Sequence, residues 1–258
     1  GKSLKWGGSL ARTEATGYGC VYFAKNMLEA RGESLKGKKC TVSGSGNVSI
    51  YTIEKLYHLG ALPITCSDSS GMILDEEGID LELLKDLKEN QRARLTEYVK
   101  YRKNAKYIPV DSYPKGRNAV WSVPCFAAFP SATQNELNIE DAKELIKNGC
   151  VCVSEGANMP STNEAVDFFV AQKIAYGPGK AANAGGVATS QLEMAQNASM
   201  VSWTFEEVDA KLEKIMKHIF DTASATAKEF GEPTNLVLGA NIAGFRRVAD
   251  AMIEQGIV

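Results

Sequence analysis

The chain has 258 residues, of which 44% are hydrophobic and 23% are charged, and its formal net charge is −2. This length is sufficient for one large domain or two small ones. The small net charge gives no electrostatic basis for binding nucleic acid or an anionic membrane surface. No apolar run approaches the length of a transmembrane helix and no signal-peptide pattern is visible, so we expect no membrane association.

The cysteines and histidines exclude several kinds of site. The six cysteines form no CxxC pair, and three of them lie in apolar runs typical of strands. We therefore expect free, buried thiols and a cytoplasmic location, where the environment is reducing. The two histidines, His58 and His218, lie in predicted helices without a ligand-spaced neighbour. No metal site and no serine or cysteine triad is expected.

The predicted elements alternate between strands and helices. A glycine-rich loop over 1–13 precedes a helix that begins at Thr13 or Thr16 and ends near Arg31. A charged amphipathic stretch over 75–103 predicts one long helix with a solvated face. The other predictions are strands over 40–42, 62–66, 120–123, 150–154 and 174–176, helices over 48–59, 139–148, 162–171, 187–198, 204–230 and 236–255, and loops over 124–130 and 177–186.

A glycine turn lies between the first predicted strand and the next helix. Gly44 allows a tight turn, and Gly46 lets backbone amides approach a pyrophosphate at the helix N-terminus, where Asn47 follows. Asp68 comes 24 positions after Gly44, close to the spacing at which an acidic residue binds a ribose hydroxyl. Ser49 stands where a third glycine or alanine is usual. The alternative is a tight turn in an α/β protein that binds no ligand.

Together these patterns predict an α/β fold: a Rossmann-like, doubly wound, mostly parallel sheet with helices on both faces and a helical C-terminal tail. We see no linker, so residues 1–258 are taken as one dinucleotide-binding domain. It comprises an opening loop and helix over 1–35, a core over 36–186 and C-terminal helices over 187–258. Ligands of such sheets bind beyond the strand C-termini. Polar residues predicted there are Ser45, Asn47, Asp68, Ser69, Gln134, Asn135, Asn158 and Asn183.

Several segments in the same order resemble the glutamate dehydrogenase family, specifically its C-terminal coenzyme-binding domain. The resemblance covers essentially the whole chain and points to the hexameric, NADP-using branch, so a homo-hexamer is expected for a full-length member. The matching segments are WGGSLARTEATGYG at 6–19, GSGNV at 44–48, SDSSG at 67–71, SATQNELN at 131–138, EGANMPSTNEA at 155–165, GPGKAANAGGVATS at 177–190 and NLVLGANIAGFRRVADAMIEQG at 235–256.

The resemblance implies a reaction in which L-glutamate, NADP and water give 2-oxoglutarate, ammonia and NADPH by hydride transfer. It assigns the nicotinamide carboxamide to Thr16, and the nicotinamide ribose and ring to Gln134 and Asn158. The pyrophosphate turn would comprise Gly44, Ser45, Gly46, Asn47 and Val48. Arg12 would lie near the substrate or a structural carboxylate, and the substrate-facing positions would be Asn183, Val187 and Ser190. Amides and hydroxyls suit these roles because they orient a hydride donor without adding charge.

Two catalytic motifs of the family are not found in this sequence. One is a lysine-rich glycine motif and the other is PAxD, and both belong to the family's N-terminal substrate domain. Without a lysine to activate water, only half of the active site is expected here, and no catalytic residue is assigned. We therefore expect the chain alone to bind cofactor and to turn over glutamate negligibly.

The choice between NADP and NAD depends on the loop around Asp68. A carboxylate alone favours NAD, because it pairs with the 2′-hydroxyl and repels a 2′-phosphate. In the family's NADP-specific members, an SDSSG loop with its serines, here including Ser69, and a lysine placed like Lys88 meet the phosphate. Basic groups can neutralise both the carboxylate and the phosphate. We expect NADP, with NAD the less favoured cofactor.

Other functions remain open at this stage. The chain could be a stand-alone NADP(H)-binding or regulatory module, or a relative that acts on leucine, valine or phenylalanine. An exposed apolar face on the last helix would favour a missing partner domain, whereas a covered one would favour an independent module. Departures from the family pattern at Phe126, Ser131 and Gln191 concern the cofactor wall and the substrate pocket.

Overall fold

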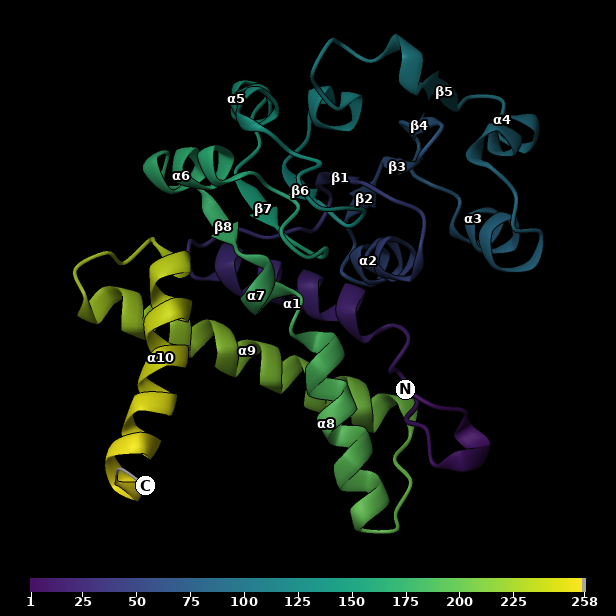
Figure 1. Cartoon of the computed structure of the whole chain (residues 1–258). Coiled ribbons are helices and arrows are strands. Elements are labelled where there is room, and N and C mark those ends of the chain that lie inside the picture. Colours follow the sequence, from purple (N-terminus) through teal and green to yellow (C-terminus); the bar gives the residue numbers. More distant parts are fainter. Residues whose placement is uncertain (257–258) are drawn as a thin grey trace.

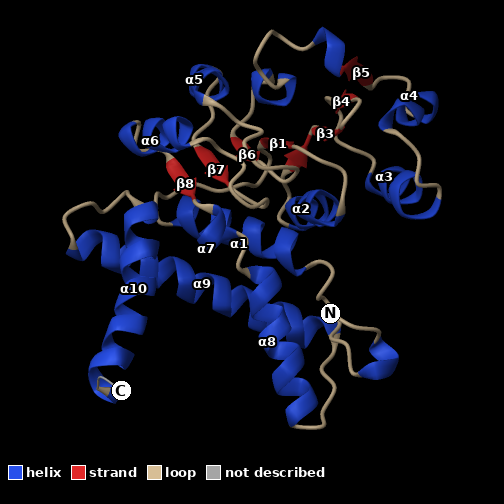
Figure 2. Cartoon of the chain, viewed as in Figure 1, coloured by secondary structure: helices blue, strands red, loops and turns tan. Residues whose placement is uncertain are grey.

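The computed structural model describes residues 1–256 and contains two sheets. The larger sheet is parallel, with strand order β2-β1-β6-β7-β8, and the smaller one is antiparallel, with order β3-β4-β5. Figure 2 shows the two sheets in red. The strands are β1 Lys39–Val42, β2 Leu62–Pro63, β3 Thr65–Asp68, β4 Gly71–Leu74, β5 Lys106–Pro109, β6 Ala127–Phe129, β7 Cys152–Ser154 and β8 Ala175–Gly177.

Helices cover both faces of the parallel sheet (Figure 1). Helices α5 and α6 lie on one face over a core that includes Trp121, and α1 and α2 lie on the other. The fold predicted from sequence, including the helical C-terminal segment, is confirmed. The helices are α1 Ala15–Glu29, α2 Asn47–His58, α3 Leu81–Lys85, α4 Tyr98–Tyr101, α5 Ile139–Lys147, α6 Asn163–Ala171, α7 Gly179–Ala182, α8 Gly185–Ala198, α9 Phe205–Glu229 and α10 Leu236–Gln255.

Helix α1 is the most enclosed helix and packs closely against two others. A Cβ atom on Gly17 would lie 2.5 Å from the backbone nitrogen of Thr52 in α2, so only glycine allows this approach. On the α8 side, a Cβ on Gly19 would lie 2.9 Å from the Cα of Gly185, and one on Gly185 would lie 2.2 Å from the carbonyl oxygen of Ala15. The glycines of the ATGYG and NAGGV segments thus join α1 to α2 and α8 by backbone contact.

The prediction of one long helix over 75–103 is wrong. This stretch instead contains α3, a π-helical turn over Asp86–Asn90, a 3₁₀ turn over Leu95–Glu97 and α4. Leu84, Leu87 and Leu95 are fully buried in the first three pieces and Tyr98 is fully buried in α4, so each short piece is held by its own apolar side chain rather than by one continuous apolar stripe. Strands β4 and β5, which flank this stretch, were not predicted.

Two further predictions are corrected around the central strand β6. The strand predicted over 120–123 is a 3₁₀ turn, Ala119–Ser122, and β6 lies within the predicted loop 124–130. β6 is buried on both faces, where the small side chains of Ala127 and Ala128 allow helices to pack, so it has no β-branched signal. The predicted strand 62–66 is divided between the two sheets, and the predicted loop 177–186 contains α7 and the start of α8.

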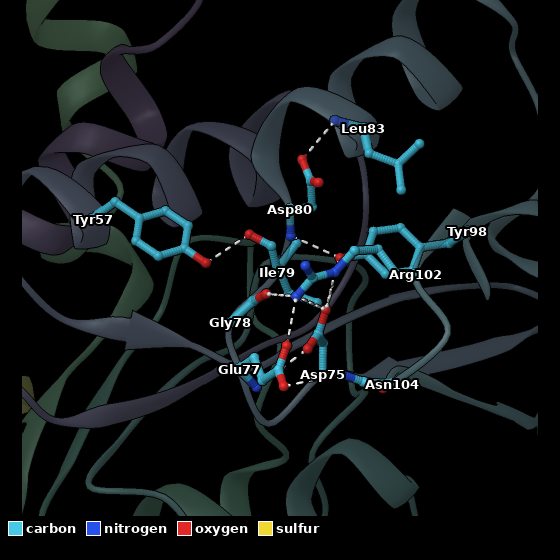
Figure 3. A network of polar contacts seen from close by, with 10 residues as sticks. All are labelled: Tyr57, Asp75, Glu77, Gly78, Ile79, Asp80, Leu83, Tyr98, Arg102 and Asn104. Carbon is cyan, nitrogen blue, oxygen red and sulfur yellow. Dashed lines mark hydrogen bonds and ion pairs between the residues drawn. The ribbon is translucent and has the colours of Figure 1, made fainter. Parts of the chain in front are cut away.

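A buried carboxylate organises the antiparallel sheet and the short helices beside it (Figure 3). Asp75, which follows β4, has a fully buried side chain and accepts hydrogen bonds from Arg102 Nε at 2.9 Å and from the Tyr98 hydroxyl at 3.2 Å. The Tyr98 hydroxyl in turn accepts from the Asp80 backbone N–H at 2.7 Å. Asp75 therefore ties β4 to α4 and to the start of α3, and so fixes the segment that follows β3.

Replacing Arg102 with methionine tests this network. Arg102→Met leaves the Asp75 carboxylate buried without its cation, so we expect the free energy of unfolding to fall by about 3 kcal/mol. Urea denaturation of both proteins measures the change. Lys103→Met, at an exposed neighbouring position, is the control and should leave the unfolding free energy nearly unchanged. Equal stability of Arg102→Met and the parent chain would contradict a structural role for the pair.

Candidate functional site

The glycine turn between β1 and α2 forms the floor of the site. Gly44 has φ +83°, and a Cβ atom there would lie 2.3 Å from Ser49 Oγ, so both the conformation and the space require glycine. Gly46 caps α2 without a side-chain hydrogen bond, which leaves the first N–H groups of the helix available to an anion. The departure at Ser49 is accommodated, because its hydroxyl donates to the Ser43 carbonyl at 2.7 Å.

Two adjoining cavities lie at the carboxyl ends of the parallel strands. The glycine-turn cavity, of about 1060 Å³, is lined by the turn, by Asp68 and Ser69 at the end of β3, by residues 113–118, and by residues of the loop after β6. The amide cavity, of about 680 Å³, lies between that same loop, the loop after β7, α1 and α8. Val48 and residues 131–133 line both, so the two cavities form one continuous cleft.

Nearly all of the residues predicted from sequence line this cleft. Lys88 is the exception, since it lines neither cavity. The glycine-turn cavity contains Gly44, Ser45, Gly46, Asn47, Val48, Asp68 and Ser69. The amide cavity contains Arg12, Thr16, Val48, Gln134, Asn158, Asn183, Val187 and Ser190.

Hydrogen bonds orient the polar wall of the amide cavity. The Asn183 side-chain amide donates to Asn158 Oδ1 at 2.8 Å and to the Ala157 carbonyl at 3.2 Å. Arg12 Nε donates to Ser190 Oγ at 2.8 Å across the gap between the N-terminal segment and α8. Among the described residues that line this cavity, Arg12 is the one with an ionisable side chain. The wall can therefore orient a polar ligand but carries no group suited to general acid or base catalysis at neutral pH.

The Asp68 carboxylate is hydrogen-bonded to its own loop and to the 3₁₀ turn that begins at Leu95. Its Oδ1 accepts from the backbone N–H of Ser70 at 2.8 Å, and its Oδ2 accepts from the Leu95 N–H at 3.0 Å. Burial acts to raise the pKa of Asp68, but the Ser70 hydroxyl, these two N–H groups and the nearby Lys88 outweigh it and hold the pKa below its usual range. Lys88 Nζ lies 3.9 Å from Asp68 Oδ2 and donates to the Ala93 carbonyl at 3.0 Å. Lys88 thus compensates the charge of Asp68 without lining either cavity.

Glu136 is a site residue that the sequence analysis did not single out. Its Oε1 accepts hydrogen bonds from Ser43 Oγ and from the N–H of Ala132 at 2.9 Å, and from the N–H of Thr133 at 3.3 Å. Burial raises the pKa of Glu136 to about 7, against the opposing effect of these hydrogen bonds. Glu136 therefore holds the loop that both cavities share.

Two cations of the glycine-turn cavity, Lys115 and Arg117, were also missed. They follow β5 in a loop for which the sequence analysis made no prediction. The signal available was local: basic residues on either side of Gly116, directly after Pro114, are typical of an exposed turn. The sequence does not indicate that this turn lies at the strand ends, because its position depends on hydrogen bonds with the N-terminus of α5.

The departures from the family pattern lie in different places. Ser131 lines both cavities, and its hydroxyl donates to the Phe129 carbonyl at 3.1 Å. Phe126 lines neither cavity and packs beneath Lys38, whose Nζ lies 4.9 Å from the ring centroid. Gln191 is exposed on α8. Of the three, Ser131 is the one that contributes to the wall of the cleft.

Comparison with known proteins identifies the family. Residues 7–256 match the family described as Glutamate/Leucine/Phenylalanine/Valine dehydrogenase. The chain is 67% identical over 257 residues to the NADP-specific glutamate dehydrogenase of Helicobacter pylori (strain J99) and 50% identical over 258 residues to that of Escherichia coli (strain K12). Each alignment covers all of this chain but only 57% and 56% of the relative, so the chain spans little more than half of their length.

A solved structure agrees with this assignment. The crystal structure of Plasmodium falciparum glutamate dehydrogenase superposes with a TM-score of 0.94 at 48% identity, over 100% of this chain and 55% of that one. The chain belongs to the Glutamate/Leucine/Phenylalanine/Valine dehydrogenase family. Within residues 1–256, no cluster of histidine, cysteine and acidic side chains is arranged to hold a metal ion. In the same range, no helix has the length and apolar character needed to cross a membrane.

The raised pKa of Glu136 predicts a pH dependence of stability. Between its ordinary pKa of 4.5 and about 7, the folded chain binds the Glu136 proton more tightly than the unfolded chain does. This contribution is fully present below pH 4.5 and is lost as pH rises through 7, on the order of 3 kcal/mol in total. Glu136→Gln keeps an acceptor oxygen but cannot ionise. Urea denaturation should therefore show that this variant loses less stability between pH 5 and pH 8 than the parent chain does. An identical loss in both proteins would contradict a raised pKa of Glu136 in the folded chain.

Proposed function

We propose that this chain is the coenzyme-binding half of an NADP-dependent glutamate dehydrogenase. The observation that carries the proposal is the continuous cleft, in which an anion-binding helix N-terminus joins two cavities of different character. The adenosine half of a dinucleotide fits the glycine-turn cavity, the pyrophosphate fits the turn at Gly46 and Asn47, and the nicotinamide half fits the amide cavity. The names of the related proteins support NADP and glutamate as the ligands.

In this arrangement Thr16, Gln134 and Asn158 orient the nicotinamide ring. The bound cofactor supplies a hydride acceptor. The chain's own contribution is to hold one ring face toward the substrate, which amide and hydroxyl groups achieve without adding charge. The glutamate-facing positions are Arg12, Asn183, Val187 and Ser190, and the contact between Arg12 and Ser190 supports placing the distal carboxylate of the substrate near them.

The proposed overall reaction converts L-glutamate, NADP and water to 2-oxoglutarate, ammonia and NADPH. Its proton transfers need a general base and an acid, and the lining of the amide cavity offers neither. We infer that the chain alone binds cofactor with negligible turnover. Six free, buried thiols within the described residues support a reducing, cytoplasmic location.

NADP is favoured over NAD by the state of the loop after β3. Because Asp68 is already paired with Lys88 and accepts hydrogen bonds from the N–H groups of Ser70 and Leu95, it presents less free negative charge to a 2′-phosphate. The Ser69 hydroxyl lines the same cavity and accepts a hydrogen bond from Arg94 Nη1 at 2.6 Å. In this proposal Ser69 and its basic neighbours face the phosphate, and Lys88 compensates Asp68.

A stand-alone binding module is the second candidate, and the surface of α10 argues against it. Phe245, Val248, Met252 and Ile253 are 72%, 61%, 67% and 78% exposed. An apolar face of this kind favours a further packed segment over an independent module. A relative acting on leucine, valine or phenylalanine would share the family, but the supporting matches at 67% and 50% identity carry the glutamate dehydrogenase name.

Calorimetric titration with NADPH and with NADH tests the proposal directly. We expect the chain to bind NADPH more tightly than NADH, because Lys88 compensates Asp68 and because Ser69 is proposed to face the additional phosphate. An assay of the same sample with glutamate and NADP should show no measurable reduction of the cofactor. Failure to bind either nucleotide would refute the coenzyme-binding function, and glutamate-dependent NADPH formation would refute the claim that catalytic groups are lacking.

Charge reversal at Lys88 tests the discrimination between the cofactors. Lys88→Glu leaves Asp68 uncompensated and adds a second negative charge, so NADPH affinity should fall about tenfold while NADH affinity changes little. Lys88→Gln, which adds no repulsion, should show a smaller loss with the same selectivity. Lys103→Glu is the control for net charge. Equal losses for NADPH and NADH would indicate that Lys88 only maintains the loop.

A further inference from the structure

A turn in the loop between β5 and α5 forms the outer wall of the glycine-turn cavity. The Arg117 N–H donates to the Pro114 carbonyl at 3.0 Å and closes the turn, and Gly116 adopts φ +70° at its third position. Lys115 occupies the second position and lines the same cavity as Asp68 and Ser69. The exposed side chain of Lys115 therefore begins at the tip of the turn.

The turn is held rigidly against the N-terminus of α5. Asn138, the N-cap residue of α5, donates from its side-chain amide to the Gly116 carbonyl at 2.6 Å. The backbone N–H of Asn118 donates to Asp141 Oδ1 at 3.0 Å. Because Asn138 and Asp141 also form the capping box of α5, the position of the turn is set by a well-formed helix. The backbone of Lys115 is thus fixed while its long side chain keeps its freedom.

Among the residues that the structure describes, the Lys115 side chain has no partner, unlike the other cations in or near the cavity. Lys88 is engaged with Asp68 and the Ala93 carbonyl, and Arg117 is 3.3 Å from Glu144. Arg94 donates to Ser69. Within residues 1–256, no hydrogen bond or ion pair of the Lys115 side chain is found. An unpaired ammonium group facing a cavity is well placed to pair with an anionic ligand.

We propose that Lys115 contacts the 2′-phosphate of the cofactor and is a specificity-determining residue for NADP. This inference rests on the proposed function, since it assumes that the adenosine half occupies the glycine-turn cavity. The 2′-phosphate carries close to two negative charges, and Asp68 adds a third that Lys88 compensates. The pyrophosphate does not require Lys115, because the backbone N–H groups and dipole of α2 already serve it. Lys115 supplies the positive charge that the phosphate at the adenosine end needs.

Lys115→Gln, titrated with NADPH, NADH, 2′,5′-ADP and 5′-AMP, tests the proposal. We expect NADPH and 2′,5′-ADP to bind about tenfold more weakly, because one charge-assisted contact is lost, and NADH and 5′-AMP to bind as they do to the parent chain. The dependence of NADPH affinity on salt concentration should also become shallower. Lys103→Gln, an exposed lysine that lines neither cavity, is the matched control and should bind all four ligands like the parent chain.

The outcomes separate this inference from the proposed function. If the parent chain binds neither NADPH nor NADH, the proposed function fails. If the parent chain binds NADPH and Lys115→Gln binds it equally well, only the role of Lys115 is refuted. Equal weakening of NADPH and NADH would place Lys115 at the pyrophosphate or in the fold of the turn, and would also overturn the proposal. Lys115→Arg keeps the charge on the same turn and should retain the preference for NADPH.

Discussion

The cleft depends on the close backbone contact that α1 makes with α2 and α8. The amide cavity is lined by Thr16 on α1, Val48 on α2 and Ser190 on α8. The shape of the cavity therefore depends on how these three helices are placed relative to one another. Gly17 and Gly19 allow the close approach of these helices, because a single methyl group at either residue would overlap backbone atoms of the neighbouring helix. Packed interiors do not absorb such an overlap without moving a whole element. Gly17 and Gly19 therefore shape the amide cavity without lining it.

The parts of the fold that were predicted correctly are those specified by nearby residues. Gly44 and Gly46 mark the turn between β1 and α2 within a few positions, and the apolar spacing of α2 repeats over its length. The stretch 75–103 fails because its pieces are held by distant partners. Asp75 depends on Arg102 and Tyr98, which lie more than twenty positions away, and no helical period reveals that contact. Likewise, β6 is a strand because its neighbours enclose it, whereas its own alanines favour other structures.

The candidate site divides in the same way between local and distant determinants. Residues of the glycine turn and of the loops directly after β6, β7 and β8 were found, because strand ends of a parallel sheet converge at one edge. Lys115 was missed because its turn reaches that edge through the hydrogen bond from Asn138, which follows it by 23 positions. Glu136 belongs to a recognised segment, but its acceptor role depends on Ser43 on the other side of the loop. Such contacts become visible only in three dimensions.

The two cavities differ in the ionisable side chains that line them: the glycine-turn cavity has several, whereas the amide cavity has Arg12. The chemistry of the proposed cofactor offers a reason for this difference. The adenosine end would keep the same charge throughout the proposed reaction, so the cavity proposed to hold it, the glycine-turn cavity, can contain ionised side chains such as Asp68 and Lys115. The nicotinamide ring is cationic when oxidised and neutral when reduced. A carboxylate beside it would stabilise one state over the other, whereas the amides of Asn158 and Asn183 favour neither strongly. In the proposed arrangement, keeping ionised groups other than Arg12 out of the amide cavity would leave the oxidised and reduced forms of the bound ring more evenly stabilised.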